Sequence, residues 1–302
     1  EASKGFAKKF LKRHGIPTAD FTICTNATEA KAALTEVPIV LKFDGLAAGK
    51  GVAVCTTKEE AEQFIDEVME KRCFGAGDLL VEKCLTGPEI SVFASVCDDA
   101  YQILMPARDY KRIRDNDEGP NTGGMGAVAS LELADAALMQ RIEREIVQST
   151  VQGIRKDGLN YRGFLYFGLM LTPTGPQVIE YNCRFGDPEA EAVLPMVRGD
   201  FANYAFEAAK GTLKPDLIQF APGWSICLIS ASAGYPASSR NGDVISGLEA
   251  VSGARVYHCG TKRNAAGQFE TNGGRVLAIV AQGGTRHEAR DKAYAESRKV
   301  TF

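Results

Sequence analysis

Apolar residues recur at helical spacing in several segments of the chain, and the longest of these segments covers residues 135–155. Ile142, Ile146 and Val147 fall on one face there, and Asp135 precedes the first turn as a helix cap. These apolar positions are therefore expected to belong to the core. The same combination of spacing and capping residues predicts further helices over Lys4–Arg13, 28–36, 57–71, 188–197 and Phe201–Lys210, and a last helix that begins after Thr285.

Short runs rich in β-branched and aromatic residues, bounded by glycine, proline and asparagine, predict strands between these helices. Around residues 211–222 helical segments give way to strands, so we place a boundary there between domains 1–210 and 211–302. Helices and strands occur in both parts, which predicts an α/β (α+β) fold. The expected strands are Ile39–Phe43, Val52–Cys55, 79–84, Glu89–Cys97, 164–171, 177–182, 224–230, Arg255–His258 and 275–282.

The composition is that of a soluble globular protein, with 45% hydrophobic and 24% charged residues among 302. A net charge of −3 argues against a non-specific nucleic-acid binder, and no apolar run is long enough to cross a bilayer. Eight cysteines are scattered without a Cys-x-x-Cys pair, which indicates free thiols in a reducing cytoplasm. The histidines, His14, His258 and His287, lie far apart in sequence, so neither a zinc cluster nor a Ser-His-Asp triad is expected.

The segment 44–51 joins two predicted strands and reads Asp-Gly-Leu-Ala-Ala-Gly-Lys-Gly. It is not a P-loop, because Gly51 follows Lys50 where a P-loop has serine or threonine, and because a strand comes next instead of a helix. The same strand excludes a Rossmann turn. Such a hairpin can close its backbone N–H groups over phosphates, with Lys42 and Lys50 supplying positive charge. The alternative is an ordinary glycine-rich turn.

The segment 178–189 is expected to run from a strand into a loop. Side chains alternate across a strand, so Glu180 and Asn182 share one face and Tyr181 takes the other. A carboxylate beside an amide oxygen suits Mg²⁺, whose remaining positions water and phosphate can fill. Arg184 lies on the same face if the strand continues that far, and its guanidinium could then clamp a carboxylate or a phosphate. The alternative is a strand end with solvated polar residues.

A segment dense in charge precedes residues 119–126, Gly-Pro-Asn-Thr-Gly-Gly-Met-Gly, whose glycines predict a loop without regular structure. A basic segment beside such a loop could hold an anionic substrate, and the alternative is a solvent-exposed loop. Upstream, the backbone around Glu82 and Lys83 could read adenine, with Glu89 near a ribose, although a charged pair before a turn is unremarkable by itself. The charged residues of the segment that precedes the glycine loop are Arg108, Asp109, Lys111, Arg112 and Arg114.

Three motifs follow one another along the chain: Lys-x-Asp-Gly-Leu-Ala-Ala-Gly-Lys-Gly-Val from Lys42, Gly-Pro-Asn-Thr-Gly-Gly-Met-Gly-Ala from Gly119, and Glu-Tyr-Asn-Cys-Arg-Phe-Gly-Asp-Pro-Glu from Glu180. Over essentially its whole length the sequence closely resembles the glycinamide ribonucleotide synthetases, also called phosphoribosylamine–glycine ligases. The resemblance implies an ATP-grasp fold with a mobile flap at about 18–92 and a small carboxy-terminal mixed α/β domain. It also implies a fragment, because the family's amino-terminal Rossmann-like domain is absent and the family runs on past Phe302. Departures from the family pattern are Phe43 for alanine, Tyr110 for histidine and Glu191 for glutamine.

The resemblance also implies roles for individual residues. Lys4 and Lys42 would contact the ATP phosphates, and Glu180 and Asn182 would hold Mg²⁺ or Mn²⁺. Ala48, Gly49, Lys50 and Gly51 would form the flap over the phosphates, while Glu82, Lys83 and Leu85 would read adenine and Glu89 the ribose. The site for glycine and phosphoribosylamine would be lined by Asp109, Lys111, Arg112, Asn121, Thr122, Gly123, Gly124, Met125, Gly126, Arg184, Asp187, Gly274 and Arg275. Arg184, Lys42 and Lys111 are the residues expected to act in catalysis.

The implied reaction is ATP-dependent amide formation in purine biosynthesis, in which glycine is first phosphorylated and the amine of 5-phosphoribosylamine then displaces phosphate. Transferring a phosphoryl group to a carboxylate brings anions together, so lysines and Mg²⁺ are needed to neutralise charge. The implied partners are these small molecules, without nucleic acid or membrane, and fusion to other purine-pathway domains is a further expectation. The alternatives are another ATP-grasp ligase or carboxylase of purine biosynthesis and an inactive ATP-binding fragment.

Overall fold

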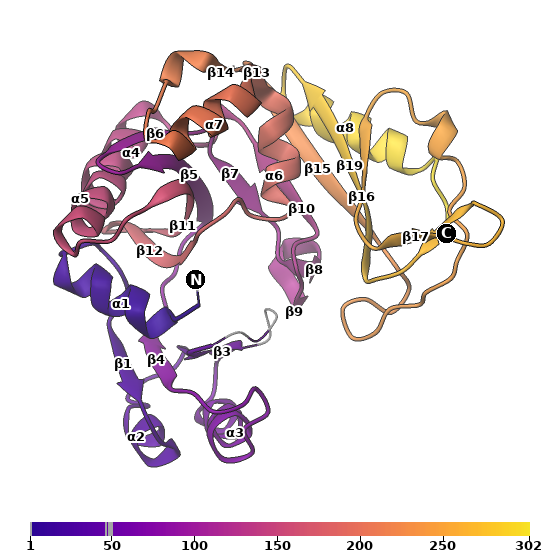
Figure 1. Ribbon diagram of the computed structural model, residues 1–302. Coiled ribbons are helices and arrows are strands. Elements are labelled where there is room, and N and C mark those ends of the chain that lie inside the picture. Colours follow the sequence, from indigo (N-terminus) through magenta and orange to yellow (C-terminus); the bar gives the residue numbers. More distant parts are fainter. Residues whose placement is uncertain (1, 46, 48–50) are drawn as a thin grey trace.

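The computed structural model describes residues 2–45, 47 and 51–302, which are arranged around two main β-sheets (Figure 1). The smaller sheet lies at the bottom of Figure 1 and is antiparallel. In spatial order its strands are β1 (Phe21–Cys24), β4 (Leu79–Lys83), β2 (Ile39–Phe43) and β3 (Val52–Cys55), and the helices α2 (Ala27–Ala32) and α3 (Lys58–Ile65) pack against it. Lys42 of β2 pairs with Val52 of β3, so the predicted hairpin around segment 44–51 is confirmed.

A larger sheet runs through the rest of the molecule. Its strands, each hydrogen-bonded to the next, are β12 (Gly175–Asn182), β11 (Arg162–Thr172), β5 (Glu89–Cys97), β7 (Ala107–Asp109), β10 (Gly126–Ala129), β15 (Trp224–Ala231), β19 (Arg275–Gly283) and β16 (Arg255–His258), and β6 (Ala100–Ile103) pairs with β5. Ala127 of β10 lies opposite Cys227 of β15, so the sheet continues across the predicted boundary at residues 211–222. The parts 1–210 and 211–302 therefore share one hydrogen-bonded sheet, and the boundary itself stays a prediction.

Alternate residues of β5 face two different cores, as expected for a strand that is buried on both sides. Val92 and Val96 pack in one cluster with Phe10 of α1 (Lys4–Arg13), and Phe93 packs in another with Tyr204 of α7 (Phe201–Lys210). Helix α1 thus joins the large-sheet core while lying beside the small sheet (Figure 1). The remaining helices are α4 (Ala136–Ile142), α5 (Gln148–Lys156), α6 (Glu189–Val193) and α8 (Arg286–Ser297), which packs against β15 and β19.

The helix predictions are confirmed where a cap and a long apolar stripe coincide. The side chain of Asp135 accepts the N–H of Leu138, and the helix predicted over 135–155 forms as α4, a π-helical turn and α5. The helix predicted over 28–36 is shorter than expected, because it begins at Ala27, where Asn26 caps it, and already ends at Ala32. The helix predicted over 188–197 is wrong at its end, since α6 stops at Val193 and Val197–Gly199 forms β13, paired with β14 (Ile218–Phe220).

The loop predicted at 119–126 is also wrong in part. Glu118–Asn121 forms β9, which pairs with β8 (Arg112–Arg114), and Gly126 opens β10. β9 forms a local hairpin with β8, whereas β10 pairs with the distant strand β15 (Trp224–Ala231), and the glycine content of the segment indicates neither pairing. A similar ribbon joins β17 (Thr261–Arg263) and β18 (Phe269–Thr271). Within the described residues, none of the helices combines the length and the hydropathy that a membrane span requires.

Candidate active site

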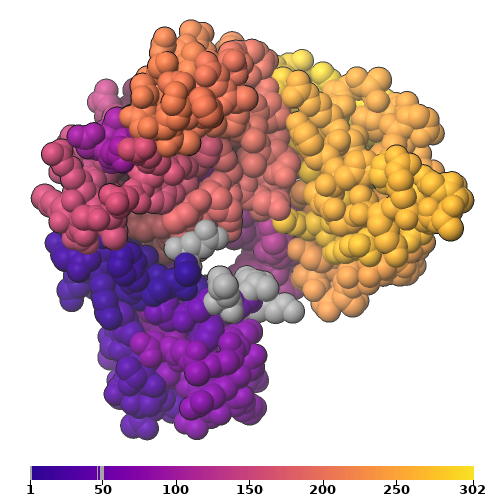
Figure 2. Space-filling model, in the orientation of Figure 1, coloured from indigo at the N-terminus to yellow at the C-terminus, as the bar shows by residue number. Residues whose placement is uncertain are grey.

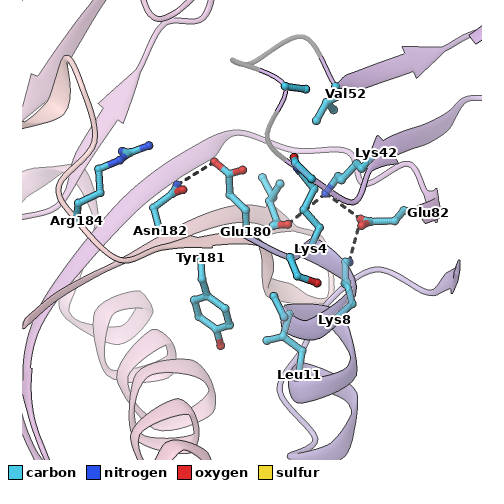
Figure 3. A pocket seen from close by; sticks show the side chains of 16 residues that line it. Lys4, Lys8, Leu11, Lys42, Val52, Glu82, Glu180, Tyr181, Asn182 and Arg184 are labelled. Atoms are coloured by element: carbon cyan, nitrogen blue, oxygen red, sulfur yellow. Dashed lines mark hydrogen bonds and ion pairs between the residues drawn. The ribbon is translucent and has the colours of Figure 1, made fainter. Parts of the chain in front are cut away.

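A cavity of about 350 Å³ lies where helix α1 meets the small sheet and strand β12 (Figure 3). Figure 2 shows the molecule hollowed at this junction, between the small-sheet unit below and the large-sheet unit above. The cavity brings together predicted nucleotide and metal residues from α1, the β2–β3 hairpin, β4 and β12. Its polar wall includes Lys4, Lys8, Lys42, Glu82, Glu180, Asn182 and Arg184.

Two lysines and one glutamate form a buried ion cluster at the inner end of this cavity (Figure 3). The Nζ atoms of Lys8 and Lys42 each lie 2.9 Å from Glu82 Oε2, and all three side chains are less than a tenth exposed. Lys42 also donates to the carbonyl of Ile179 at 3.2 Å, which ties β2 to β12. The other carboxylate oxygen, Glu82 Oε1, is buried and has no hydrogen-bond partner among the described residues. The cluster therefore carries a net charge of about +1 and one buried carboxylate oxygen without a partner among the described residues.

A third lysine of the cavity, Lys4, lies on the first turn of α1. Lys4 Nζ donates to the carbonyls of Phe43 and Gly45 at 3.0 and 3.1 Å, just before the predicted flap. Burial lowers the pKa of Lys4, and the carboxylates of Glu180 and Asp44 oppose this effect. Asp44 in turn accepts from Ser3 Oγ and from the N–H of Gly5 at 3.1 Å each, so the end of β2 is fixed to the start of α1.

The predicted metal residues share one face of β12, as their alternation requires (Figure 3). Asn182 Nδ2 donates to Glu180 Oε1 at 3.3 Å, while Tyr181 points the other way and its hydroxyl meets Thr150 Oγ1 at 2.7 Å. The described part of the chain holds no group of three or more His, Cys, Asp or Glu side chains that could bind a metal. Two oxygen donors fit an ion that is held mainly by ligand phosphates and water, as Mg²⁺ commonly is.

Arg184 reaches the same cavity by a different route from the one expected. Strand β12 ends at Asn182, so the condition that the strand continues to Arg184 is wrong. The side chain nevertheless lines the cavity beside Asn182, and its Nη1 donates to the carbonyl of Phe185 at 2.8 Å (Figure 3). A guanidinium in this exposed position can still contact a ligand that sits over Glu180 and Asn182.

The charged segment before the glycine loop lies along β7 and β8. Lys111 Nζ pairs with Glu89 at 2.8 Å, so a predicted substrate residue and the predicted ribose residue meet directly. Asp109 Oδ1 is buried without a hydrogen-bond partner in the described residues. Burial, with the nearby charge of Glu189, raises the pKa of Asp109 to about 8, although Lys111 opposes the shift. Asp109 therefore holds its proton over much of the neutral range.

Two side chains from the carboxy-terminal part clamp the glycine loop. The N–H of Gly123 donates to the hydroxyl of Tyr235 at 2.9 Å, and its carbonyl accepts from Arg275 Nη1 at 2.7 Å. Arg275 Nη2 also pairs with Asp187 at 2.8 Å. A Cβ atom on Gly274 would lie 2.2 Å from the ring of Tyr235, so this packing requires glycine. Arg275 and Gly274 were expected here, whereas nothing in the local sequence indicated Tyr235.

The remaining predicted residues fall into three groups. Gly51 lines the cavity, whereas Ala48, Gly49 and Lys50 lie outside the described residues. Lys83 and Leu85 follow the cavity residue Glu82 without being part of its described wall. Around the glycine loop, Thr122 Oγ1 donates to the carbonyl of Lys111, and Arg112 Nη1 donates to the carbonyl of Gly119. Asn121 lies opposite Arg112 in the pairing of β9 with β8. The carbonyl of Met125 accepts from the N–H of Ile229, and Gly126 begins β10.

Comparison with known proteins decides the family. Residues 2–190 match the family model "Phosphoribosylglycinamide synthetase, ATP-grasp (A) domain", and residues 225–302 match the C domain of the same family. This chain belongs to the phosphoribosylglycinamide synthetase family. The resemblance and the ATP-grasp α+β fold expected from the sequence are thereby confirmed.

Three relatives of this synthetase chain illustrate the match. The phosphoribosylamine–glycine ligase of Caldanaerobacter subterraneus is 43% identical over the whole chain, which spans 73% of that protein. The crystal structure of the ligase from Thermotoga maritima has a TM-score of 0.91 at 37% identity and is covered to 76%. The trifunctional purine biosynthetic protein adenosine-3 of Drosophila melanogaster is 41% identical over the whole chain, which covers 23% of it.

The three departures from the synthetase pattern lie in different surroundings. The ring of Phe43 packs against Phe74 at 5.6 Å, and a Cβ atom on Gly77 would lie 2.6 Å from that ring. The hydroxyl of Tyr110 accepts from Arg286 at 2.8 Å, which joins the charged segment before the glycine loop to α8. Burial raises the pKa of Glu191, whose Oε2 has no hydrogen-bond partner in the described residues.

Proposed function

We propose that this protein catalyses the ATP-dependent ligation of glycine to 5-phosphoribosylamine, which gives glycinamide ribonucleotide, ADP and phosphate in purine biosynthesis. Membership of the synthetase family supports the reaction class. The observation that carries the proposal is the cavity in which the cationic residues Lys4 and Lys42 face the oxygen donors Glu180 and Asn182. Such a cavity suits a polyphosphate with its metal ion.

In this proposal the inner end of the cavity holds the nucleotide. Lys4 and Lys42 each use two contacts to protein oxygens for orientation and direct their charge at the phosphates. The backbone around Glu82, Lys83 and Leu85 would read adenine, as the resemblance implies. Glu89, whose carboxylate is held by Lys111, would face the ribose and bring Lys111 near the transferred phosphoryl group. The flap role of Ala48, Gly49 and Lys50 stays a prediction from the sequence.

Glu180 and Asn182 would hold Mg²⁺, or Mn²⁺ in its place, together with oxygens of the nucleotide. The ion would neutralise charge that spreads over the phosphate oxygens during transfer. Glu180 supplies the negative charge that keeps the ion at this face of β12, and Asn182 supplies a neutral oxygen that adds no repulsion toward phosphate. The hydrogen bond between these two side chains keeps them side by side when the ion is absent.

We further propose that glycine and phosphoribosylamine bind between Arg184 and the clamped glycine loop. The glycine carboxylate attacks the γ-phosphorus, the bond to the β-phosphate oxygen breaks, and glycyl phosphate and ADP form. The amine of phosphoribosylamine then attacks the acyl carbon, the bond to the phosphate oxygen breaks, and phosphate leaves as the amide forms. Arg184 and Lys111 would offset the charge of the anionic groups, and Asp109 would face an amino group of a substrate.

This chemistry needs no covalent bond to the protein. The acyl phosphate hydrolyses readily, so closure of the hairpin over the cavity would serve to exclude water. We place the enzyme in the cytoplasm, with small molecules as its partners, and expect fusion to other purine-pathway domains in some relatives, as in the Drosophila protein.

The first test is a coupled assay of the intact enzyme. ADP release should require glycine, phosphoribosylamine and Mg²⁺ together, with one phosphate released for each glycinamide ribonucleotide formed. Replacing glycine with bicarbonate should abolish turnover, which separates this ligase from a carboxylase of the same fold. Bicarbonate-dependent turnover without glycine would contradict the proposed function, and calorimetric titration with Mg-ATP reports separately whether the nucleotide binds.

A second prediction concerns the clamp on the glycine loop. Tyr235→Phe removes the hydroxyl that accepts from Gly123 but keeps the ring against Gly274. The KM for phosphoribosylamine should rise about threefold to tenfold, the value of one hydrogen bond, while the KM for ATP changes less than about twofold. Tyr294→Phe, which removes the hydroxyl of an exposed tyrosine of α8, is the matched control. Equal changes in both KM values, or none, would show that the clamp does not position a substrate loop.

A further inference from the structure

Lys8 is a charged residue of the cavity whose role the proposed reaction leaves open. Its Nζ contacts Glu82 Oε2 at 2.9 Å, Thr18 Oγ1 at 2.7 Å and the carbonyl of Ala19 at 3.4 Å. An ammonium group has three N–H donors, so these three contacts use its whole capacity. Thr18 in turn donates to the carbonyl of Val178 at 2.7 Å, which fixes the arrangement to β12. All three N–H donors of Lys8 are therefore directed at protein oxygens.

Lys42 and Lys4 differ from Lys8 in this respect. Lys42 contacts Glu82 Oε2 and the carbonyl of Ile179, and Lys4 contacts two backbone carbonyls. Each of these ammonium groups thus has a donor beyond its contacts with described protein atoms. The two lysines can meet a phosphate oxygen, whereas Lys8 would have to give up a protein contact to do so.

The position of Glu82 makes the charge of Lys8 matter. One carboxylate oxygen sits between the two ammonium groups at equal distances of 2.9 Å, and its side chain is only 4% exposed. With Lys42 alone, the carboxylate would cancel the positive charge at the wall of the cavity. With Lys8 added, the cluster keeps a net charge of about +1, which is costly to bury unless an anion arrives. Burial lowers the pKa of Lys8 to about 8, so the group is mostly protonated at neutral pH.

We infer that Lys8 acts as a positioning and charge-compensating residue for the nucleotide, which neutralises Glu82 so that Lys42 presents its charge to the phosphates. This inference rests on the proposed function, because it assumes that an ATP phosphate reaches Lys42. Lys8 itself need not touch the ligand. The electrostatic effect of one unit charge a few ångströms away, at the effective dielectric of a partly buried site, is worth at least a tenfold change in affinity.

Lys8→Met in the intact enzyme should therefore raise the Kd for Mg-ATP, measured by calorimetry, about tenfold or more. Lys8→Gln, which keeps a donor for Thr18 but loses the charge, should weaken binding to a similar extent. Lys9→Met is the matched control, because Lys9 is the next residue of α1 and is exposed. Its Kd should stay within about twofold of wild type, since its charge faces solvent.

The deciding variant is the double change Lys8→Met with Glu82→Gln. It restores the net charge of +1 at Lys42, and the amide oxygen of glutamine can still accept from Lys42, so the Kd should return to within about threefold of wild type. Thermal midpoints of all variants are measured in parallel. If the methionine variant does not fold, Lys8→Gln alone and Lys8→Gln combined with Glu82→Gln provide the same comparison. Unchanged binding in the Lys8 variants, or weak binding that the double change does not rescue, would overturn the inference alone. A wild-type enzyme that does not bind Mg-ATP would overturn the proposed function together with it.

Discussion

Glu180→Gln is expected to slow ligation about a hundredfold or more, while the melting temperature of the nucleotide-free protein stays within about 2 °C of wild type. The substitution removes the negative charge at the face that would hold Mg²⁺. It keeps the shape of the side chain and an oxygen for the Asn182 amide, and Glu180 makes few other contacts because it points into the cavity. The Glu180→Gln variant should therefore keep its fold although it no longer holds Mg²⁺.

The measurement pairs the Mg²⁺ dependence of the rate with the Kd for ATP, with and without Mg²⁺. In the variant, added Mg²⁺ should no longer tighten ATP binding as it does in the wild type. Glu249→Gln, an exposed acid in the carboxy-terminal part, controls for the loss of one charge. Asn182→Asp is the opposite change, and it should keep the Mg²⁺ dependence while weakening ATP binding, because a second carboxylate faces the phosphates. An active Glu180→Gln enzyme with an unchanged Mg²⁺ requirement would remove Glu180 from the metal site.

The parts of this site that the sequence predicted are local in origin. The alternation of β12 places Glu180 and Asn182 on one face whatever the rest of the molecule does, and the caps and apolar stripe of α1 place Lys4 on its first turn. The hairpin around segment 44–51 follows from two β-branched runs with a glycine-rich link. These features depend on neighbours within a few residues, so their periodicity is visible in the chain.

The parts that the sequence could not indicate come from contacts between distant segments. Glu82 looks like an ordinary charged residue at the end of a strand, and only the packing of α1 against the small sheet brings Lys8 to it. Tyr235 occupies an unremarkable turn of the carboxy-terminal part, yet its hydroxyl accepts from the N–H of Gly123 in the part before residue 211. Short strands such as β7 and β10 likewise exist because they pair with strands farther along the chain, which single-sequence propensity does not contain.

The second substitution with a large expected effect is at Arg184, which lies just beyond the end of β12 at Asn182. The exposed side chain of Arg184 lines the cavity beside Asn182 (Figure 3). A guanidinium that clamps a carboxylate or phosphate does so with two parallel N–H donors, and lysine cannot reproduce that fork. The contribution of Arg184 to substrate binding should therefore depend on the planar shape of its guanidinium as well as on its charge.

Arg184→Lys is accordingly expected to lower kcat/KM for glycine about a hundredfold, equivalent to about 2.7 kcal/mol, with the Kd for Mg-ATP changed less than about twofold. The melting temperature should stay close to wild type, because the side chain is exposed and lysine keeps the charge. Arg290→Lys on α8, an exposed arginine paired with Asp291, is the matched control and should leave both constants unchanged. Normal turnover in Arg184→Lys, or a loss of activity that follows a loss of stability, would assign Arg184 to the structure of its loop. A loss confined to kcat/KM for glycine would place the guanidinium against the reacting carboxylate, on the side of the cavity opposite the buried lysines.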